Sequence, residues 1–124
     1  MSANTSLLAH LDDEAIRHEL RGFPEATIAS VLSLRENHTP SALGNAVLGL
    51  LAFYLPKGSA ITDLAAQPPS ARLREDLGVD SLAFSEAAYK MEELFNVRIE
   101  NAELAEIHTI GALTQFAQQK LGAR

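Results

Sequence analysis

The sequence predicts an all-α fold. Apolar residues recur at the spacing i, i+3, i+4, i+7 that places them on one face of a helix. Most of these runs begin at an Asp, Thr, Asn or Pro, residue types that favour helix starts. With 124 residues and no cysteine, the chain is expected to form one domain with a modest core, without disulfides or cysteine-based metal sites.

Two amphipathic helices are expected at the N-terminus. Asp12 can cap the first, over about residues 13–21, and Gly22 ends it. Pro24 suits the first position of the second helix, which runs to about Glu36.

The next predicted helix is capped by Thr39, begins at Pro40 and ends near Leu55. It has no charged side chain and is apolar on nearly all sides. Its length is near the minimum for a membrane span, but its glycines and prolines favour a buried helix instead. A helix that is apolar all round must be covered all round. We therefore expect residues 12–36 to pack on it; the alternative is that they project and bind a partner enzyme or a second copy.

A long loop over about 59–76 leads to a helix predicted over about 81–95. Gly78 allows a sharp change of direction, and Asp80 is a good N-cap, which places Ser81 at the helix start. There a phosphate ester would be favoured by roughly 0.3–1 kcal/mol. The predicted inner face holds Phe84, Ala87, Ala88, Met91, Leu94 and Phe95, and the outer face Ala83, Glu86, Lys90 and Glu93.

Two further helices complete the prediction. Asn101 can cap a short helix over about 102–106, and Thr109 can cap the last, through about Leu121. The residues expected to face inward on the last helix are Ile110, Leu113, Ala117 and Leu121. Four scattered histidines show no metal-ligand spacing, so no metal site is expected.

Negative charge is concentrated around Ser81. The net charge is −6, and residues 75–106 hold nine acidic residues against two basic ones. A solvated helix face is the usual meaning of such charge. Beside Ser81 we also expect it to steer partners with basic patches, and it argues against nucleic acid as a partner.

A single serine before a helix is usually only a helix cap, but the wider sequence pattern around Ser81 indicates a functional residue. Over roughly residues 40–121 the chain resembles the acyl carrier proteins, a family of phosphopantetheine-binding domains. The matching residues are Glu75, Asp76, Leu77, Gly78, Asp80, Ser81, Leu82, Glu86, Glu92, Glu93, Leu94, Phe95, Ile99, Ile107, His108, Thr109, Ile110 and Gly111.

The resemblance implies that Ser81 carries a 4′-phosphopantetheine arm, transferred from coenzyme A by a phosphopantetheinyl transferase. The arm holds acyl groups as thioesters and delivers them to synthase, reductase, dehydratase or acyltransferase enzymes. The chain itself is then not an enzyme and has no catalytic residues. The expected docking residues are Asp76, Asp80, Leu82, Glu86, Glu92 and Glu93.

The resemblance also implies a four-helix bundle of three long helices and one short one, here with two additional N-terminal helices. We expect a monomer in which residues 1–38 form an extension packed on a carrier domain over residues 39–124. No secretory signal is recognised at the N-terminus, so a cytoplasmic location is expected.

The sequence departs from a typical fatty-acid carrier in several places. Ala83 stands where an acid is usual, Ser85 replaces an aliphatic residue, and no proline follows Ile99. Fatty-acid, specialised-lipid and polyketide-type pathways therefore stay open, and an unmodified helical interaction module is the alternative function. Tyr89 and Phe116 are expected at the core or its edge, although Tyr89 could instead line an acyl pocket.

Overall fold

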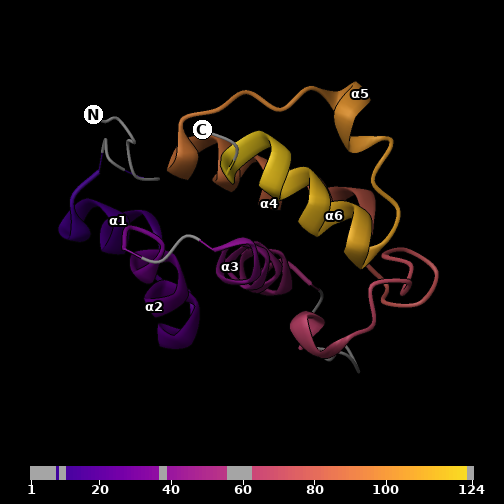
Figure 1. Cartoon of the computed structure of the whole chain (residues 1–124), viewed down its shortest axis with the longest axis horizontal. Helices are drawn as coiled ribbons and strands as arrows, with labels where there is room; N and C mark the ends of the chain where they lie inside the picture. The colour runs from indigo at the N-terminus through magenta and orange to yellow at the C-terminus, as the bar shows by residue number, and fades with distance from the viewer. Residues whose placement is uncertain (1–7, 9–10, 37–38, 56–62, 123–124) are drawn as a thin grey trace.

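The computed structural model describes residues 8, 11–36, 39–55 and 63–122, and this part of the chain is helical without β-strands (Figure 1). The helices are α1 (Asp13–Glu19), α2 (Glu25–Ser33), α3 (Pro40–Phe53), α4 (Ser81–Phe95), α5 (Asn101–Leu104) and α6 (Ile110–Ala117). A 3-10 turn, η1 (Leu64–Ala66), precedes α4, and a π-helical turn, η2 (Gln118–Gly122), extends α6. The predicted all-α fold is confirmed.

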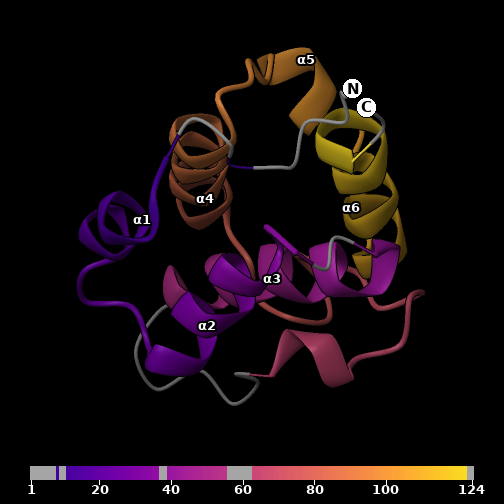
Figure 2. The ribbon, with the colours of Figure 1, turned by 60° about the vertical axis from the view of Figure 1, so that its left-hand side comes forward.

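Helix α3 is the centre of the molecule. Figure 1 shows it almost end-on, with α1 and α2 on one side and α6 on the other, and α3 contacts α2, α4, α6, η1 and η2. In Figure 2, α4 and α6 stand above α3, with α5 across the top. Because so many elements surround it, seven residues of α3 are buried: Leu43, Gly44, Ala46, Val47, Leu48, Leu50 and Leu51.

The N-terminal helices share this core. The ring of Phe23 stacks on Phe53 of α3 at a centroid distance of 3.9 Å, and Thr27 lies against Gly49. Ile28 and Val31 of α2 are also buried. Helix α1 is tied to α4 by Lys90, whose Nζ donates to the Glu19 backbone oxygen and to its carboxylate, each at 3.0 Å. The apolar surface of α3 is therefore covered on this side by α2.

Most predicted caps are present. Asp12, Thr39, Asp80 and Thr109 each accept a hydrogen bond from a backbone N–H in the first turn of α1, α3, α4 and α6. The predicted inner residues of the last helix, Ile110, Leu113, Ala117 and Leu121, are all buried. Asn96 ends α4 in the left-handed conformation, with φ of 55°.

Two predicted helix starts are wrong by one residue. Pro24 is the N-cap of α2 rather than its first helical residue, because its ψ of 146° is extended. Glu100, not Asn101, precedes the first turn of α5, and its backbone N–H donates to Glu103 at 2.8 Å. Helix α2 also ends earlier than expected, at Ser33. The first part of the predicted 59–76 loop lies outside the described residues.

Three residues of α4 differ from their predicted environment. Ala83 is 3% exposed rather than on the outer face, because it lies one turn before Ala87 on the buried stripe. Lys90 is half-buried by its contacts with Glu19. Tyr89, expected at the core edge, is 61% exposed, whereas Phe116 packs against the core as predicted.

Candidate functional site

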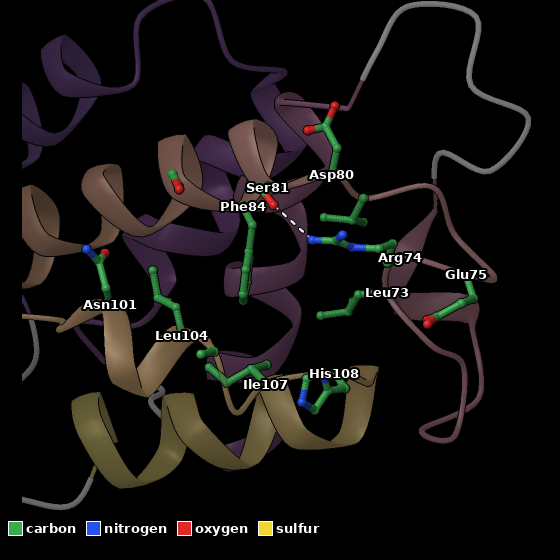
Figure 3. Close-up of a pocket in the computed structure, with 13 residues that line it drawn as sticks. Leu73, Arg74, Glu75, Asp80, Ser81, Phe84, Asn101, Leu104, Ile107 and His108 are labelled. Carbon is green, nitrogen blue, oxygen red and sulfur yellow. Dashed lines mark hydrogen bonds between the residues drawn. The ribbon is translucent and has the colours of Figure 1, made fainter.

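Ser81 is exposed at the first position of α4 (Figure 3). The Asp80 carboxylate accepts a hydrogen bond from the Ala83 N–H at 2.8 Å, so it is occupied in capping the helix. On the other side, Arg74 Nη2 donates to Ser81 Oγ at 2.8 Å. The serine hydroxyl is thus accessible and held between a helix start and a guanidinium group.

The loop before Ser81 has a fixed backbone. The Leu73 N–H donates to the His108 carbonyl at 2.8 Å, and the Val79 N–H donates to the Leu73 carbonyl, also at 2.8 Å. The buried side chains of Leu73, Leu77 and Val79 attach the loop to the core. Gly78 turns the chain with φ of +74°, a conformation that residues with a Cβ rarely adopt. These contacts determine where Arg74 and Ser81 lie relative to each other.

The same loop is bound to the start of α6. The N–H groups of Ile110 and Gly111 donate to the carbonyls of Ala71 and Pro69, at 3.0 and 2.8 Å. A Cβ at Gly111 would lie 3.2 Å from the Pro69 oxygen, so a larger residue would fit only if Pro69 moved by a few tenths of an ångström. Ser81 is therefore positioned by α4, by the loop and, through the loop, by α6.

An open cavity of about 570 Å³ adjoins Ser81 between α4, α5 and the segment before α6. Figure 3 shows Phe84, Leu104 and Ile107 lining it, with Asn101 at one end and His108 near the base. Its lining also includes Ser85. A second hollow of about 380 Å³ lies on the other side of Ser81, towards Gly78 and Leu82. Arg74 and Ser81 line both hollows, so a group attached to Ser81 could extend into either.

Some of the residues predicted for docking form one exposed face. Leu82, Glu86, Tyr89 and Glu93 follow one another at helical spacing on α4 and are exposed, Leu82 by 68%. The Glu93 carboxylate, as a hydrogen-bond partner of the phenol, raises the pKa of Tyr89. Tyr89 was not predicted for docking; its place on the same helical stripe as Glu86 is the signal that would have indicated it.

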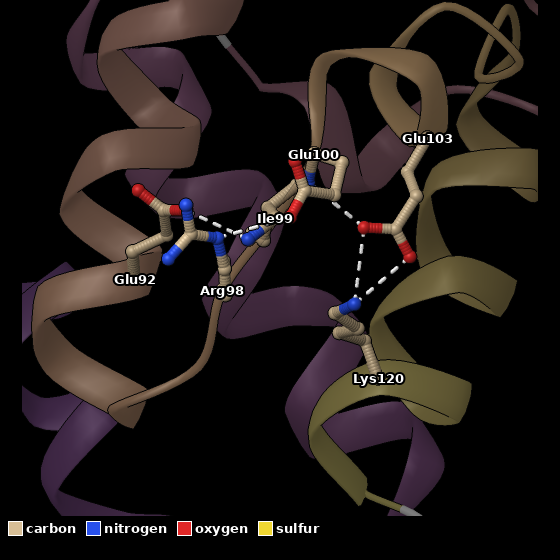
Figure 4. A network of polar contacts seen from close by, with 6 residues as sticks. All are labelled: Glu92, Arg98, Ile99, Glu100, Glu103 and Lys120. Carbon is tan, nitrogen blue, oxygen red and sulfur yellow. Dashed lines mark hydrogen bonds and ion pairs between the residues drawn. The ribbon is translucent and has the colours of Figure 1, made fainter.

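Glu92 and Asp76 have structural contacts instead. Glu92 is half-buried, and its carboxylate accepts the Ile99 N–H at 2.6 Å (Figure 4). Figure 4 also shows Lys120 bound to Glu103 at 2.8 Å, a hydrogen bond that lowers the pKa of Glu103. Asp76 accepts from the backbone N–H of Arg72 at 2.8 Å and from its guanidinium at 3.1 Å. The predicted acidic set is thus divided between an exposed helix face and residues that hold loops in place.

Arg74 is a second residue that the sequence interpretation missed. Its sequence signal is weak: it is a basic residue directly before Glu75 and Asp76, with a second one, Arg72, two positions earlier. Elsewhere in the described residues, no group of three or more His, Asp or Glu side chains could hold a metal ion. Among the described helices, none has both the length and the apolar character needed to cross a membrane.

Comparisons with known proteins point to one family. The family model described as phosphopantetheine attachment site matches residues 59–117. An acyl carrier protein of Thermotoga maritima is 36% identical over 52 residues, which are 42% of this chain and 64% of that protein. The acyl carrier protein MbtL of Mycobacterium tuberculosis is 32% identical over 75 residues, 60% of this chain and 83% of that protein. No solved structure gave a significant match.

Proposed function

Because this chain belongs to the acyl carrier protein family, we propose that Ser81 is the residue that carries its 4′-phosphopantetheine group. The observation that supports this most directly is the exposed Ser81 hydroxyl at the N-terminus of a 15-residue helix, inside the segment that the family model matches. Members of this family are carriers and not enzymes, and the group supplies a thiol that holds acyl chains as thioesters.

The surroundings of Ser81 fit such a group. A phosphodiester at Ser81 Oγ would meet the Arg74 guanidinium and the positive end of the α4 dipole. The open cavity beside Ser81 has the volume for part of an acyl chain, and its wall includes Phe84, Leu104 and Ile107. Asp80 keeps the helix start, and thus the hydroxyl, in place.

The assignment is tested by intact mass after incubation with coenzyme A and a phosphopantetheinyl transferase. Wild-type protein should gain the mass of one 4′-phosphopantetheine. Ser81→Ala should gain none while keeping its helical circular dichroism spectrum. Ser85→Ala is the matched control, because Ser85 is an exposed serine one turn further along α4, and it should be modified like wild type. Modification of Ser81→Ala would contradict the assignment, and an unmodified wild type would support the interaction-module alternative.

For the cargo, we propose an acyl group with a polar substituent, as in specialised-lipid or polyketide-type biosynthesis. The supporting observation is the cavity wall, where Ser85, Asn101 and His108 add hydrogen-bonding groups to an apolar surface. A site that hydrogen-bonds a hydroxyl discriminates well against a chain that lacks it. Phosphopantetheinyl transferase, synthases, reductases, dehydratases and acyltransferases remain the proposed partners, approaching the α4 face of Leu82, Glu86 and Glu93.

The cargo proposal predicts different stabilities for different acyl forms. Loading with 3-hydroxyoctanoyl should raise the melting temperature of the protein more than loading with octanoyl. Ser85→Leu should reduce this preference, because it replaces one of the three hydrogen-bonding groups in the cavity wall by an apolar group. Equal or greater stabilisation of the wild-type protein by octanoyl would contradict a polar cargo.

A further inference from the structure

We propose that Arg74 binds the phosphodiester through which the prosthetic group is attached, and so fixes the base of the arm. This inference rests on the proposed attachment at Ser81. It is carried by the contact between Arg74 Nη2 and Ser81 Oγ, a donor–acceptor distance of 2.8 Å. The ligand class is a singly charged phosphate diester on this serine.

Arg74 differs from four of the five other arginines in the part of the chain that the structure describes; the exception is Arg21, whose guanidinium lies 3.5 Å from the His18 ring. Arg17, Arg35, Arg72 and Arg98 each form an ion pair with a carboxylate, to Glu25, Asp13, Asp76 and Glu100. Within that part, Arg74 has no carboxylate within ion-pair distance, and its recorded side-chain hydrogen bond goes to the Ser81 hydroxyl. Figure 3 shows the carboxylate of the adjacent Glu75 apart from the Arg74 guanidinium. The guanidinium therefore keeps donors for a further anion.

The backbone that carries Arg74 is held on both sides. Leu73 is bonded through its N–H to His108 and through its carbonyl to Val79, and the Arg74 carbonyl accepts the Gly78 N–H at 3.2 Å. Leu73 itself is buried. The contact with Ser81 thus arises from the folded loop, and little ordering of the backbone remains to be done when an anion arrives.

Attachment of the prosthetic group would turn the existing hydrogen bond to a neutral hydroxyl into an ion pair between Arg74 and the phosphate. When the Ser81 hydrogen is replaced by phosphorus, the two non-bridging phosphate oxygens, which share the negative charge, are bonded to the atom directly beyond Oγ. A guanidinium already 2.8 Å from Oγ is then near both oxygens, and its planar fork suits bidentate contact with phosphate.

The surrounding charge favours a basic partner for the phosphate. Asp80 precedes the serine and Glu75 follows Arg74, so a new negative charge at Ser81 enters an acidic region. The α4 N-terminus offsets part of this repulsion. Arg74 is placed to offset more of it, and by holding the phosphate it would restrict the first bonds of the arm to the rim shared by the two hollows.

The test compares unmodified and fully modified forms of four proteins: wild type, Arg74→Gln, Arg74→Lys and Arg98→Gln. Arg98→Gln is the matched control, since it removes a guanidinium whose side chain is 86% exposed and paired with Glu100. Denaturant unfolding gives the change in the folding equilibrium constant on modification. The ratio of the folding equilibrium constants of the modified and unmodified forms should be about threefold to tenfold lower for Arg74→Gln than for wild type. For Arg98→Gln this ratio should equal that of wild type.

Phosphorus-31 NMR of the modified proteins provides a readout independent of stability. The phosphodiester resonance should move on Arg74→Gln, move less on Arg74→Lys because the charge remains, and stay in place on Arg98→Gln. If Arg74→Gln shows the wild-type effect of modification on folding and the wild-type phosphorus shift, the proposed role of Arg74 is refuted. A wild-type protein that gains no prosthetic group would refute the attachment itself and with it this inference, and the mass spectrum distinguishes the two cases.

Discussion

The carboxylates around Ser81 have different structural roles, which cannot be distinguished from their positions in the sequence. Asp80 caps α4 through the Ala83 N–H, Asp76 closes the preceding turn on Arg72, and Glu86 is exposed on the next turn of α4. All three belong to the acidic segment of residues 75–106. Only the free carboxylates are available to a partner, so a count of charges overestimates the docking surface.

Asp76 should make the stability of the protein sensitive to acid. Hydrogen bonds from Arg72 hold the pKa of Asp76 below its usual value, which is about 3.9 in an unfolded chain. Its stabilisation is therefore complete above that value and is lost as the pH falls through the lower, folded-state pKa. Thermal unfolding of wild type and Asp76→Asn should show wild type more stable at pH 7. The difference should shrink below about pH 4.

Arg72→Gln supplies the control for this prediction. It removes the side-chain donors that lower the pKa of Asp76, so its melting temperature should show a flatter acid dependence than that of wild type, close to that of Asp76→Asn. In Arg72→Gln the backbone N–H at position 72 still donates to the Asp76 carboxylate, so a small residual effect of pH is expected for that variant. A constant difference between wild type and Asp76→Asn from pH 7 to pH 3 would contradict the assigned cause.

At the scale of single residues, the sequence predicts contacts that are local. The caps Asp12, Thr39, Asp80 and Thr109 bond to an N–H three residues ahead, and each was predicted correctly. The bond between Arg74 and Ser81 spans seven residues across a folded loop. It depends on loop contacts with His108, which no local pattern contains.

At the scale of elements, helix α4 begins and ends where the sequence predicts. The surroundings of two of its residues, Ala83 and Glu92, differ from what the sequence pattern indicates. Ala83 has no strong polarity of its own, so its burial is decided by the α4 stripe that faces the core. Glu92 looks like another surface acid, yet it accepts the Ile99 N–H of the segment that follows the helix. Periodicity predicts the face of a residue only where tertiary contacts do not override it.

The exposed face of α4 should control recognition by the transferase. Glu86 is exposed and makes no ion pair among the described residues, so Glu86→Lys should slow modification of Ser81 several-fold without a large change in melting temperature. The wild-type rate should also fall as salt rises, because exposed charges are screened within about 10 Å at 0.1 M salt. The initial rate of mass gain measures both effects.

Glu92→Gln is the comparison for docking. It removes one negative charge from the same helix, but at a half-buried position whose carboxylate holds the Ile99 N–H. It should therefore leave the rate of modification nearly unchanged and lower the thermal stability instead. Equal slowing by the two variants, or a rate that does not depend on salt, would argue against docking through this face.

At the scale of the whole molecule, the all-round apolar character of α3 predicts that further chain must cover it, and in the structure α2 lies on its outer side. Which residues meet was not predictable, because the stacking of Phe23 on Phe53 depends on the angle between α2 and α3. The boundary between the extension and the carrier domain, near residue 38, remains a proposal.

Removing the extension should therefore expose the core and lower the stability. Residues up to position 37 contribute buried side chains at Leu8, Ile16, Leu20, Phe23, Ile28, Val31 and Leu34. Each fully buried Leu, Ile, Val or Phe is worth about 1.5–3 kcal/mol relative to exposure. A chain lacking residues 1–37 should melt well below the full-length protein and bind a hydrophobic dye, because Leu48 and its neighbours lose the cover of α2.

A single substitution separates this packing from a mere effect of chain length. Phe23→Ala removes the ring that lies on Phe53 and Tyr54 and should lower the free energy of unfolding by about 3 kcal/mol. Arg17→Ala changes only an exposed ion pair with Glu25 in the same segment, so it should cost less than about 1 kcal/mol. If the shortened chain melts at the full-length temperature, stays monomeric and binds no dye, the extension is not part of the core. It would then be free to bind a partner enzyme.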